Sequence, residues 1–277
     1  TNYCFILPFF EDWFTEKGFV PVRFISPNLG EAVRFNPLYG NTDPTAAMVI
    51  YGLTLVAALC TALGLFTRLS TVVLLLGITA LHHRTSDILH SGDTMMRVFA
   101  LYLALAPCGL TLSLDRWMQV KSGKAKPVPE VSLWPQRLME IQVAIVYFTT
   151  VWHKWQGTAW RDGTATWFTA QLKEFDRFPV PAFMESRPMV AMTTWGTLIV
   201  EIALATLVFW RPARNWVILA GVLLHLGIEY QMNIPLFAFI MIASYASFIE
   251  GEEWPGIFEK ARGWWRGLRR RKATQHA

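Results

Sequence analysis

Long runs of uncharged, apolar residues are the feature that most restricts what this chain can fold into. Residues 45–66 contain no charged side chain and are long enough to cross a bilayer, which takes about 20 helical residues. Charged residues make up only 16% of the 277 residues, whereas about 25% is usual for a soluble domain. The sequence therefore predicts a polytopic membrane protein rather than a soluble one.

The apolar runs divide the chain into about eight membrane segments, of which the first is incomplete. Residues 3–10 are apolar but too short to span, and no initiator Met precedes them, so we expect the front of a first span to be missing. Period-two alternation is absent, so helices should satisfy the backbone in each segment. The predicted fold class is an all-α, polytopic transmembrane helical bundle over residues 1–250. Its other seven segments are residues 45–66, 69–81, 98–114, 141–152, 189–210, 216–228 and 230–249.

The distribution of basic residues predicts which side of the membrane each link faces. Seven of the 25 Lys and Arg lie between Lys260 and Lys272, so the positive-inside rule places the C-terminus in the cytoplasm. Counting backwards, the basic link at residues 114–138 falls on the same side, and residues 82–93 and 153–188 fall on the other. We therefore expect a multi-pass membrane protein with a cytoplasmic C-terminus.

Residues 251–277 are expected to form a second unit, a basic amphipathic helix and tail at the cytoplasmic surface. Apolar side chains recur at helical spacing over residues 257–268, with Lys and Arg between them, which is typical of a helix in the membrane interface. A disordered basic tail is the alternative. Basic residues beside a membrane favour membrane lipids over nucleic acid as the partner.

The residues with the clearest chemical potential follow the run at 141–152. His153 and Lys154 come directly after it, and Trp160 and Arg161 lie in the polar segment beyond. A partly desolvated lysine becomes a usable base near neutral pH, and His153 is then placed to relay a proton. The simpler alternative is that Lys154 snorkels to the lipid headgroups.

Residues 82–93 concentrate three His and two Asp in twelve positions. Asp87 and His90 are three residues apart, so they can share a helix face and orient a substrate. The spacing matches no standard zinc motif, and no metal site is expected. We favour a hydrogen-bonded polar loop, in which residues 91–93 form a turn and Asp93 caps the next helix.

Glu201 and His225 lie inside apolar runs, where an ionisable side chain is costly and needs a partner. Together with Arg97, they are expected either to make structural contacts between helices or to line a proton path or a pocket for a quinone-like headgroup. Motifs for nucleotide binding, for common hydrolases and for haem attachment are absent from the sequence. Chemistry on a membrane-dissolved substrate remains open.

Four landmarks follow one another along the chain. They are FTEKGFVP at residues 14–21, LGLFTR at residues 63–68, the block from Ser91 to Asp115, and the block from Ile145 through Lys154 and Trp160 to Gly163. In this order and spacing the chain resembles the HTTM family, the horizontally transferred transmembrane domain shared with vitamin K-dependent gamma-carboxylase. The resemblance covers about residues 8–248.

The resemblance implies a helical membrane domain with a catalytic lysine. In the carboxylase, the lysine that matches Lys154 deprotonates vitamin K hydroquinone, and oxygenation then gives the base that removes a proton from glutamate. The residue matching His153 is a lysine there, and a carboxylase histidine falls near Asp87 rather than on a histidine. The carboxylase's large luminal domain has no counterpart in this sequence. These departures argue against glutamate carboxylation and are compatible with hydroquinone chemistry.

Two functions follow from these observations. The first is a carboxylase-like membrane protein with a quinone- or lipid-binding pocket on the non-cytoplasmic side and a quinone or hydroquinone as its cofactor. The second is a non-catalytic structural subunit of a larger membrane complex, such as a pigment- or haem-containing electron-transfer complex, whose other subunits are its partners. A transporter is less favoured, because no inverted repeat is evident. The site predicted for the first function comprises Lys154 as base, His153 as relay, Trp160 and Arg161 at the rim, and Asp87 or His90 as an orienting group.

Overall fold

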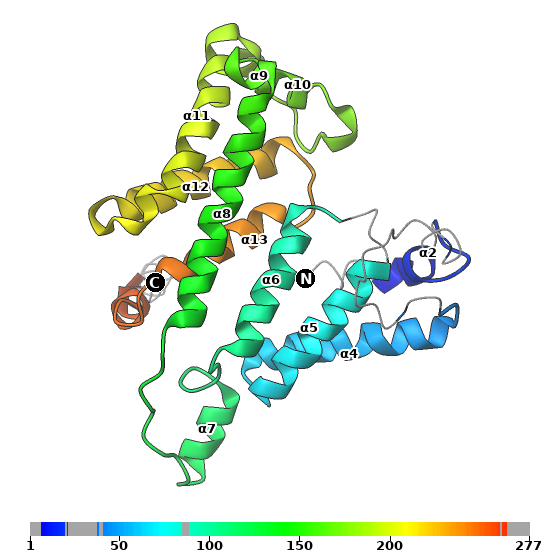
Figure 1. Cartoon of the computed structure of the whole chain (residues 1–277), viewed down its shortest axis with the longest axis vertical. Helices are drawn as coiled ribbons and strands as arrows, with labels where there is room; N and C mark the ends of the chain where they lie inside the picture. The colour runs from blue at the N-terminus through cyan, green and yellow to red at the C-terminus, as the bar shows by residue number, and fades with distance from the viewer. Residues whose placement is uncertain are drawn as a thin grey trace, which may run out of the picture.

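The computed structural model describes residues 7–19, 21, 38, 41–84, 89–260 and 262–264, and this part of the chain is built from helices (Figure 1). Its described residues contain no strand, only an isolated antiparallel bridge between Asp176 and Met232. The all-α prediction is therefore confirmed. The elements are η1 (Leu7–Phe9), α2 (Phe10–Phe14), α4 (Pro44–Leu63), α5 (Thr67–Arg84), α6 (Ser91–Leu105), α7 (Leu114–Lys121), α8 (Trp134–Gln156), α9 (Thr158–Arg161), α10 (Ala165–Ala170), η4 (Lys173–Phe175), η5 (Ala182–Glu185), α11 (Arg187–Ala205), η6 (Leu207–Phe209), α12 (Arg211–Gln231), α13 (Phe237–Ser244) and η7 (Tyr245–Phe248).

Two helices of the described chain are long and apolar enough to cross a membrane, judged by length and composition. They are α4 and α11, with 20 and 19 residues. At 1.5 Å per residue each is about 30 Å long, which matches the hydrocarbon core of a bilayer. As far as they are described, the other predicted segments fall on helices that are shorter or more polar, and residues 3–6 of the first segment lie outside the described residues. The total of eight segments therefore stays a prediction.

Prolines end two of the predicted segments early. The run at residues 98–114 is helical only in its first half, because Pro107 disfavours a helical conformation at Ala106, which is extended. The run at residues 230–249 is also interrupted. Its first residues complete α12, and Pro235 separates them from α13. Hydropathy alone overestimates the length of both helices. It takes no account of how proline restricts the residue before it, or of the N–H donor that proline lacks.

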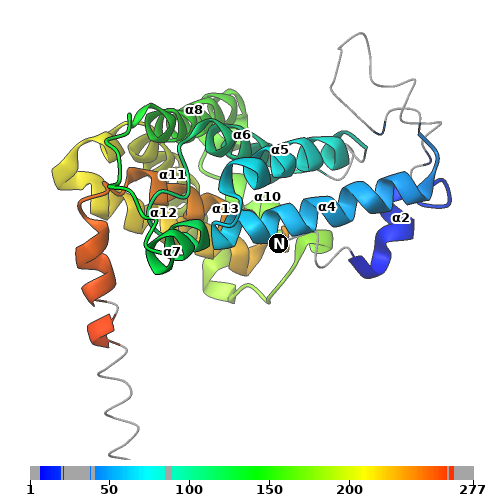
Figure 2. The same cartoon turned by 90° about the horizontal axis from the view of Figure 1, so that it is seen from below.

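Helices α4 and α5 form a hairpin at one side of the molecule (Figures 1 and 2). They approach closely where Gly77 of α5 meets Thr54 of α4, since a Cβ on Gly77 would lie 2.1 Å from the Thr54 hydroxyl oxygen. Small residues permit such close packing between membrane helices. The buried apolar side chains of this half are Phe10, Phe14, Leu38, Ala47, Tyr51, Ile78 and Leu81.

A larger core joins α6, α8, α11, α12 and α13. Helix α6 links the two halves, because it packs against α5 and also against α8 and α13. In Figure 1, α8 stands upright in the middle of this group and α12 crosses it. This second core surrounds the polar cluster described below. Its buried residues are Met95, Val143, Tyr147, Leu204, Val208, Val217, Met241, Tyr245 and Phe248.

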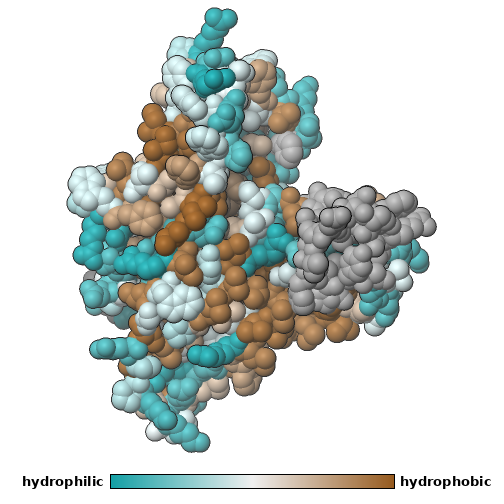
Figure 3. All heavy atoms as spheres, in the orientation of Figure 1, coloured by the Kyte–Doolittle hydropathy of each residue, from teal (hydrophilic) through white to brown (hydrophobic). Residues whose placement is uncertain are grey.

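The outer faces of the two candidate spans are apolar. Val49, Leu53 and Val56 of α4 are more than half exposed, as are Met192 and Ile199 of α11. Figure 3 shows apolar residues gathered over the part of the surface where α4 and α5 lie. Soluble proteins rarely expose contiguous apolar patches of this kind, so these faces are suited to contact with lipid.

A capped turn joins the start of α7 to the α4–α5 hairpin. The Asp115 carboxylate accepts hydrogen bonds from the Phe66 N–H and from the N–H and hydroxyl of Thr67, and the Asp115 N–H donates to the Gly64 carbonyl. Burial alone would raise the pKa of Asp115, but these three accepted hydrogen bonds outweigh it and lower the pKa. Two of the sequence landmarks, LGLFTR and the end of the Ser91–Asp115 block, therefore meet in space.

Replacing Asp115 with asparagine is expected to lower the free energy of unfolding by about 1 kcal/mol. The asparagine side chain would place its amide N–H₂ against a backbone N–H of Phe66 or Thr67, where the carboxylate accepts a hydrogen bond. The folded-state pKa of Asp115 lies below the unfolded value. Its stabilisation is therefore complete above about pH 4 and is lost as the pH falls through the folded-state pKa. Denaturation of both proteins at several pH values measures the difference. Asp162→Asn, at an exposed position, should change little, and a loss for Asp115→Asn that is the same at low and neutral pH would contradict the prediction.

Residues 254–260 and 262–264 are helical and extend away from the bundle (Figure 2). Ile257, Phe258 and Trp264 are exposed on this helix. The predicted amphipathic helix at residues 257–268 is thus helical as far as it is described, and its remainder lies outside the described residues. Its place at a membrane surface stays a prediction.

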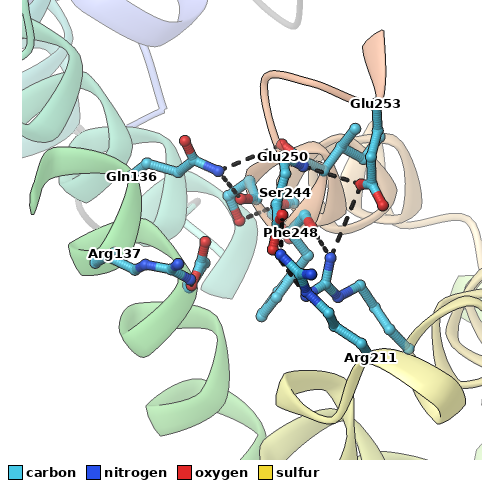
Figure 4. A network of polar contacts seen from close by, with 11 residues as sticks. Gln136, Arg137, Arg211, Ser244, Phe248, Glu250 and Glu253 are labelled. Atoms are coloured by element: carbon cyan, nitrogen blue, oxygen red, sulfur yellow. Dashed lines mark hydrogen bonds and ion pairs between the residues drawn. The ribbon is translucent and has the colours of Figure 1, made fainter. Parts of the chain in front are cut away.

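A polar network fixes the point where the bundle meets this C-terminal helix (Figure 4). Arg211 and Arg214 both pair with Glu250, and Arg214 also donates to the Phe248 carbonyl at 3.1 Å. The hydrogen bond from Arg211 is the main reason that the pKa of Glu250 is lowered. Gln136, near the start of α8, donates to two backbone carbonyls beside Phe248. The starts of α8 and α12 are thereby tied to the end of η7.

Candidate functional site

Helix α8 carries Lys154 in its last turn. Pro135 lies in the first turn, where its missing N–H has little cost, and Gly157 ends the helix in an extended conformation. His153 and Lys154 lie near the C-terminus, where a cation interacts favourably with the helix dipole. A spacing of seven residues places Tyr147 on the same helix face as Lys154.

The ammonium group of Lys154 forms an ion pair with Glu201 of α11, with 2.6 Å between Nζ and Oε1. The Lys154 side chain is 22% exposed and the Glu201 side chain only 6%. Glu201 lies fourteen residues after the start of α11, about 21 Å along a candidate span. Lys154 Nζ also lies 4.6 Å from the centre of the Trp160 ring, within range of a cation–π interaction. These contacts account for the position of Lys154 without an interaction with headgroups.

Glu201 is hydrogen-bonded on one side only. Its Oε2 atom is buried and has no hydrogen-bond partner among the described residues. A carboxylate normally accepts several hydrogen bonds when it is buried, and an exception calls for an explanation. Glu201 therefore keeps Oε2 available as an acceptor.

Three further polar side chains meet in the core beside this ion pair. Tyr147 Oη of α8 lies 2.7 Å from Nε2 of His225 on α12 and 2.5 Å from Oη of Tyr245 in η7. All three residues are buried, and His225 Nδ1 has no hydrogen-bond partner within the described part of the chain. Glu201 interacts electrostatically with both tyrosines, and Lys154 with His225. The ion pair and the tyrosine–histidine triad (Tyr147, His225 and Tyr245) therefore form one cluster.

Gly221 of α12 makes room for this triad. A Cβ at Gly221 would lie 2.7 Å from the Tyr245 Oη and 3.0 Å from a methyl carbon of Leu204. Interiors are packed at close to crystal density, so any side chain here would displace the tyrosine. Because Gly221 precedes His225 by about one turn, the same face of α12 positions both partners of Tyr147.

The cluster is equipped to exchange protons. It combines an amine, a carboxylate, an imidazole and two phenols, which are group types that enzymes use as general acids and bases. No three His, Cys, Asp or Glu side chains within the described ranges lie together so that they could hold a metal ion. The five side chains of the cluster can supply acid–base chemistry.

Comparison with known proteins identifies the family. The HTTM domain matches residues 15–254, which is most of the chain. The chain belongs to the HTTM domain family. A relative is the uncharacterized protein YitO of Bacillus subtilis (strain 168), which is 30% identical over 112 residues. That match covers 38% of this chain and 35% of YitO, so it spans about a third of the relative's length. No solved structure matches the chain significantly.

Membership of the HTTM family explains the apolar outer surface. HTTM is a transmembrane domain, and the two apolar helices α4 and α11 agree with this. The matched residues include every helix from α4 to η7, and with them the ion pair and the tyrosine–histidine triad. The recognition of this family from the four sequence landmarks is confirmed.

The structure brings some of the predicted HTTM site residues together. Lys154 and Trp160 are in direct contact. His153 is exposed next to Lys154. Arg161 is also exposed, and its backbone carbonyl accepts a hydrogen bond from the Trp195 indole at 3.3 Å. The predicted rim thus lies beside the cluster, and only Trp160 among its members contacts the lysine.

His90 holds the start of α6. Its Nδ1 accepts a hydrogen bond from the Gly92 N–H at 3.0 Å, so Nε2 carries the proton and donates to the Pro235 carbonyl at 3.1 Å. Asp93 accepts from the His90 N–H and completes a capping box. The residues predicted to form a turn, 91–93, are instead the first three residues of α6, and the N-cap residue is His90 rather than Asp93. Asp87, the other predicted orienting residue, lies outside the described residues.

Sequence reasoning does not single out Tyr147 or Tyr245, because a tyrosine in an apolar run resembles any other aromatic residue. The available signal is the seven-residue spacing between Tyr147 and Lys154. Glu201 is recognisable as an ionisable group in a span, but its partner is not. Arg97, the other candidate, lies 3.4 Å from a threonine hydroxyl in its own helix.

The segment between α10 and α11 is fastened to the end of α12. Arg177 pairs with Glu229, the Tyr230 hydroxyl donates to the Pro179 carbonyl at 3.0 Å, and Phe178 stacks on Tyr230. A pocket lies beside this segment and does not include the Lys154 cluster. It is lined by Thr166, Trp167, Ala170, Val180, Met184, Glu185, Val190, Thr193 and Gln231.

Proposed function

We propose that this HTTM domain binds a quinone- or lipid-like molecule with an ionisable hydroxyl group, in a pocket that opens on the non-cytoplasmic side of the membrane. Lys154 removes the proton from that hydroxyl. The observation that carries the proposal is the Lys154–Glu201 ion pair, at 2.6 Å between apolar helices. A hydroquinone is the favoured class of bound molecule, and glutamate carboxylation is not part of the proposal.

A contribution to the stability of the fold does not by itself explain why this ion pair is present. The cost of desolvating two charges offsets most of their attraction, so two apolar side chains would hold the helices together equally well. Ionisable side chains within membrane segments are correspondingly rare and usually serve a function. Proton transfer is a function that an amine and a carboxylate in contact can perform.

The proposed reaction moves one proton from the bound molecule. Lys154 first passes an ammonium proton to Glu201 across their hydrogen bond and becomes a neutral amine. The amine then accepts the hydroxyl proton, and the new ammonium stabilises the negative charge left on the bound molecule. The face of the Trp160 ring lies against the same ammonium group, and the ring can also pack against an aromatic headgroup. The exposed His153 returns protons to water, and Arg161 lies at the rim.

The proposed placement in the membrane follows the charge distribution. Residues 1–250 form the transmembrane domain, with eight segments in a bacterial inner membrane, and residues 251–277 form the interfacial helix that contacts anionic lipids. Helix α8 begins next to the basic link at residues 114–138, which faces the cytoplasm in this arrangement. Lys154 lies at the other end of α8, so its pocket faces the opposite side.

The proposal predicts that the protein makes a bound hydroquinone easier to ionise. In lipid nanodiscs under anaerobic conditions, a short-chain naphthohydroquinone is expected to ionise at least about one pH unit lower with the wild-type protein than with empty nanodiscs. Lys154→Arg keeps a cation for Glu201 but retains its proton across this range, so it should bind the probe without ionising it. Ultraviolet absorption distinguishes the hydroquinone from its anion.

Lys121→Arg is the matched control, since Lys121 is exposed and lies over Trp117 rather than beside a carboxylate. It should ionise the probe like the wild type. If Lys154→Arg also does so, Lys154 is not the base. If the wild-type protein does not bind the probe at all, the proposed class of ligand is wrong.

A non-catalytic subunit of a larger membrane complex is the second candidate function. Trp152, Trp155 and Trp216 are each more than half exposed, and exposed tryptophans suit packing against another membrane subunit as well as against lipid. Purification from native membranes distinguishes the two. Stable comigration with pigment-, haem- or quinone-containing subunits supports the structural role, and a solitary bundle contradicts it.

A further inference from the structure

We infer that His225 receives the proton that Lys154 gives up, so that these two bases share one proton through Glu201 and the tyrosine hydroxyls. The inference rests on the proposed function, because it supplies the neutral Lys154 amine that the proposed reaction needs. It is carried by the contacts within the cluster and by the number of charges that a buried site can balance.

Two tyrosine hydroxyl groups extend from His225 as a hydrogen-bonded row. His225 Nε2 lies 2.7 Å from Tyr147 Oη, which lies 2.5 Å from Tyr245 Oη. A hydroxyl both donates and accepts, so a row of hydroxyls passes a proton by exchanging O–H bonds. Glu201 offers its buried Oε2 atom, which has no hydrogen-bond partner in the part of the chain that is described. The transfer from Glu201 to the tyrosines requires a bridging water or a rotation of the carboxyl group.

Charge balance permits one cation in the cluster at a time. Among the described members of the cluster, the carboxylate is Glu201, which is already paired with Lys154. An uncompensated charge in a buried site is costly, so one carboxylate balances an ammonium or an imidazolium but not both. The titratable groups near His225 on neighbouring elements are Tyr147 and Lys154 of α8 and Tyr245 of η7. Glu201 of α11 is linked to them through its ion pair with Lys154. His90, at the start of α6, reaches the same region through the Phe237 ring, which contacts both histidines.

The transfer conserves atoms and charge. An ammonium proton moves from Lys154 Nζ to Glu201 Oε1, and rotation of the carboxyl group turns that proton toward Tyr245. Tyr245 accepts it and gives its own hydroxyl proton to Tyr147, which gives its own hydroxyl proton to His225 Nε2. The tautomer of His225 that accepts this proton already carries one on Nδ1. At the end Lys154 is an amine and His225 an imidazolium, while Glu201 and both tyrosines have returned to their starting forms.

Nitrogen-15 NMR of histidine-labelled protein in nanodiscs, with no quinone present, tests the inference. The chain has six histidines, and the signal of His225 is the one that disappears in His225→Gln. In Lys154→Met, His225 should become the cation that balances Glu201, so the midpoint of its titration is expected to rise by about one pH unit or more. In Lys154→Arg, a permanent cation remains and the midpoint should stay at the wild-type value.

Glu201→Gln provides a second test that does not depend on the folding of Lys154→Met. Without the carboxylate, the midpoint of His225 should fall below the wild-type value. His90 serves as the internal control for correct folding, because backbone groups contact both of its ring nitrogens and its nitrogen-15 chemical shifts at neutral pH should be the same in both variants. An unchanged His225 midpoint in either correctly folded variant overturns the inference. Since the assay contains no quinone, failure of hydroquinone binding would overturn the proposed function and leave this result in place.

Discussion

Substituting alanine for Lys154 is expected to lower the free energy of unfolding by about 3 kcal/mol. The Glu201 carboxylate would lose the cation at 2.6 Å, while its other oxygen has no hydrogen-bond partner among the described residues. Removing one member of a buried pair costs more than the pair itself contributes, because an uncompensated charge is left behind. The change therefore destabilises the contact between α8 and α11 even though Lys154 lies in the last turn of its helix.

Reversible unfolding in detergent micelles, followed by circular dichroism, measures this loss. Lys121→Ala is the matched control, because Lys121 also lies over a tryptophan ring, at 4.9 Å, but at an exposed position. It should cost about 0.5–1 kcal/mol. The double variant Lys154→Ala/Glu201→Leu should recover much of the loss, since no buried charge remains. Equal losses for the two lysines would contradict the burial of the pair.

Replacing Gly64 with alanine is also expected to cost about 3 kcal/mol, for a steric reason. Gly64 ends α4 with a φ of 67°, a left-handed conformation that costs other residues about 1 kcal/mol or more. Its new Cβ would lie 2.4 Å from the Ser113 Cβ and 2.7 Å from the Ser113 Cα, and overpacking of this kind costs about 1–3 kcal/mol. The backbone of the α4–α5 turn would have to move away from Asp115, which holds it.

Gly123→Ala separates the two contributions. Gly123 has a φ of 69°, but nothing lies within 4 Å of a Cβ built there. The same unfolding measurement should therefore give a loss of about 1 kcal/mol, from the backbone conformation alone. The difference between the losses of the two variants measures the cost of the steric overlap with Ser113. If both variants lose the same amount, the turn accommodates the methyl group and the close contact does not matter.

The fold class could be predicted because apolar runs of this length have few alternatives to a helix. The ends of the helices were less predictable. The run at residues 69–81 continues through His82 to Arg84, and both of these polar side chains are buried. The Arg84 guanidinium lies 3.4 Å from the Thr15 carbonyl, a contact between segments that are distant in the sequence. Hydropathy ends a segment at its first polar residues, whereas a tertiary partner allows the helix to continue.

The candidate site could be predicted in part. Lys154 stands out because an ionisable group follows an apolar run directly. Its pairing with Glu201 could not be predicted, because it depends on α8 packing against α11, and the sequence equally allows Glu201 to pair with Arg97. Nor does the sequence distinguish a tyrosine whose hydroxyl is buried from one that faces lipid. That distinction comes from helix packing, which places Tyr147 against His225.

In the proposed multi-pass arrangement, the members of the cluster enter the membrane at different times during synthesis. Helix α8 inserts first with Tyr147 and Lys154, Glu201 follows 47 residues after Lys154, and Tyr245 follows 98 residues after Tyr147. Until the later helices arrive, α8 holds a cation and a phenol that the lipid cannot pair with. A newly made α8 should therefore remain at the insertion machinery until α11 and α12 have been translated. In that arrangement, we expect the spacing of these polar residues along the chain to set the order in which the helices are released into the bilayer.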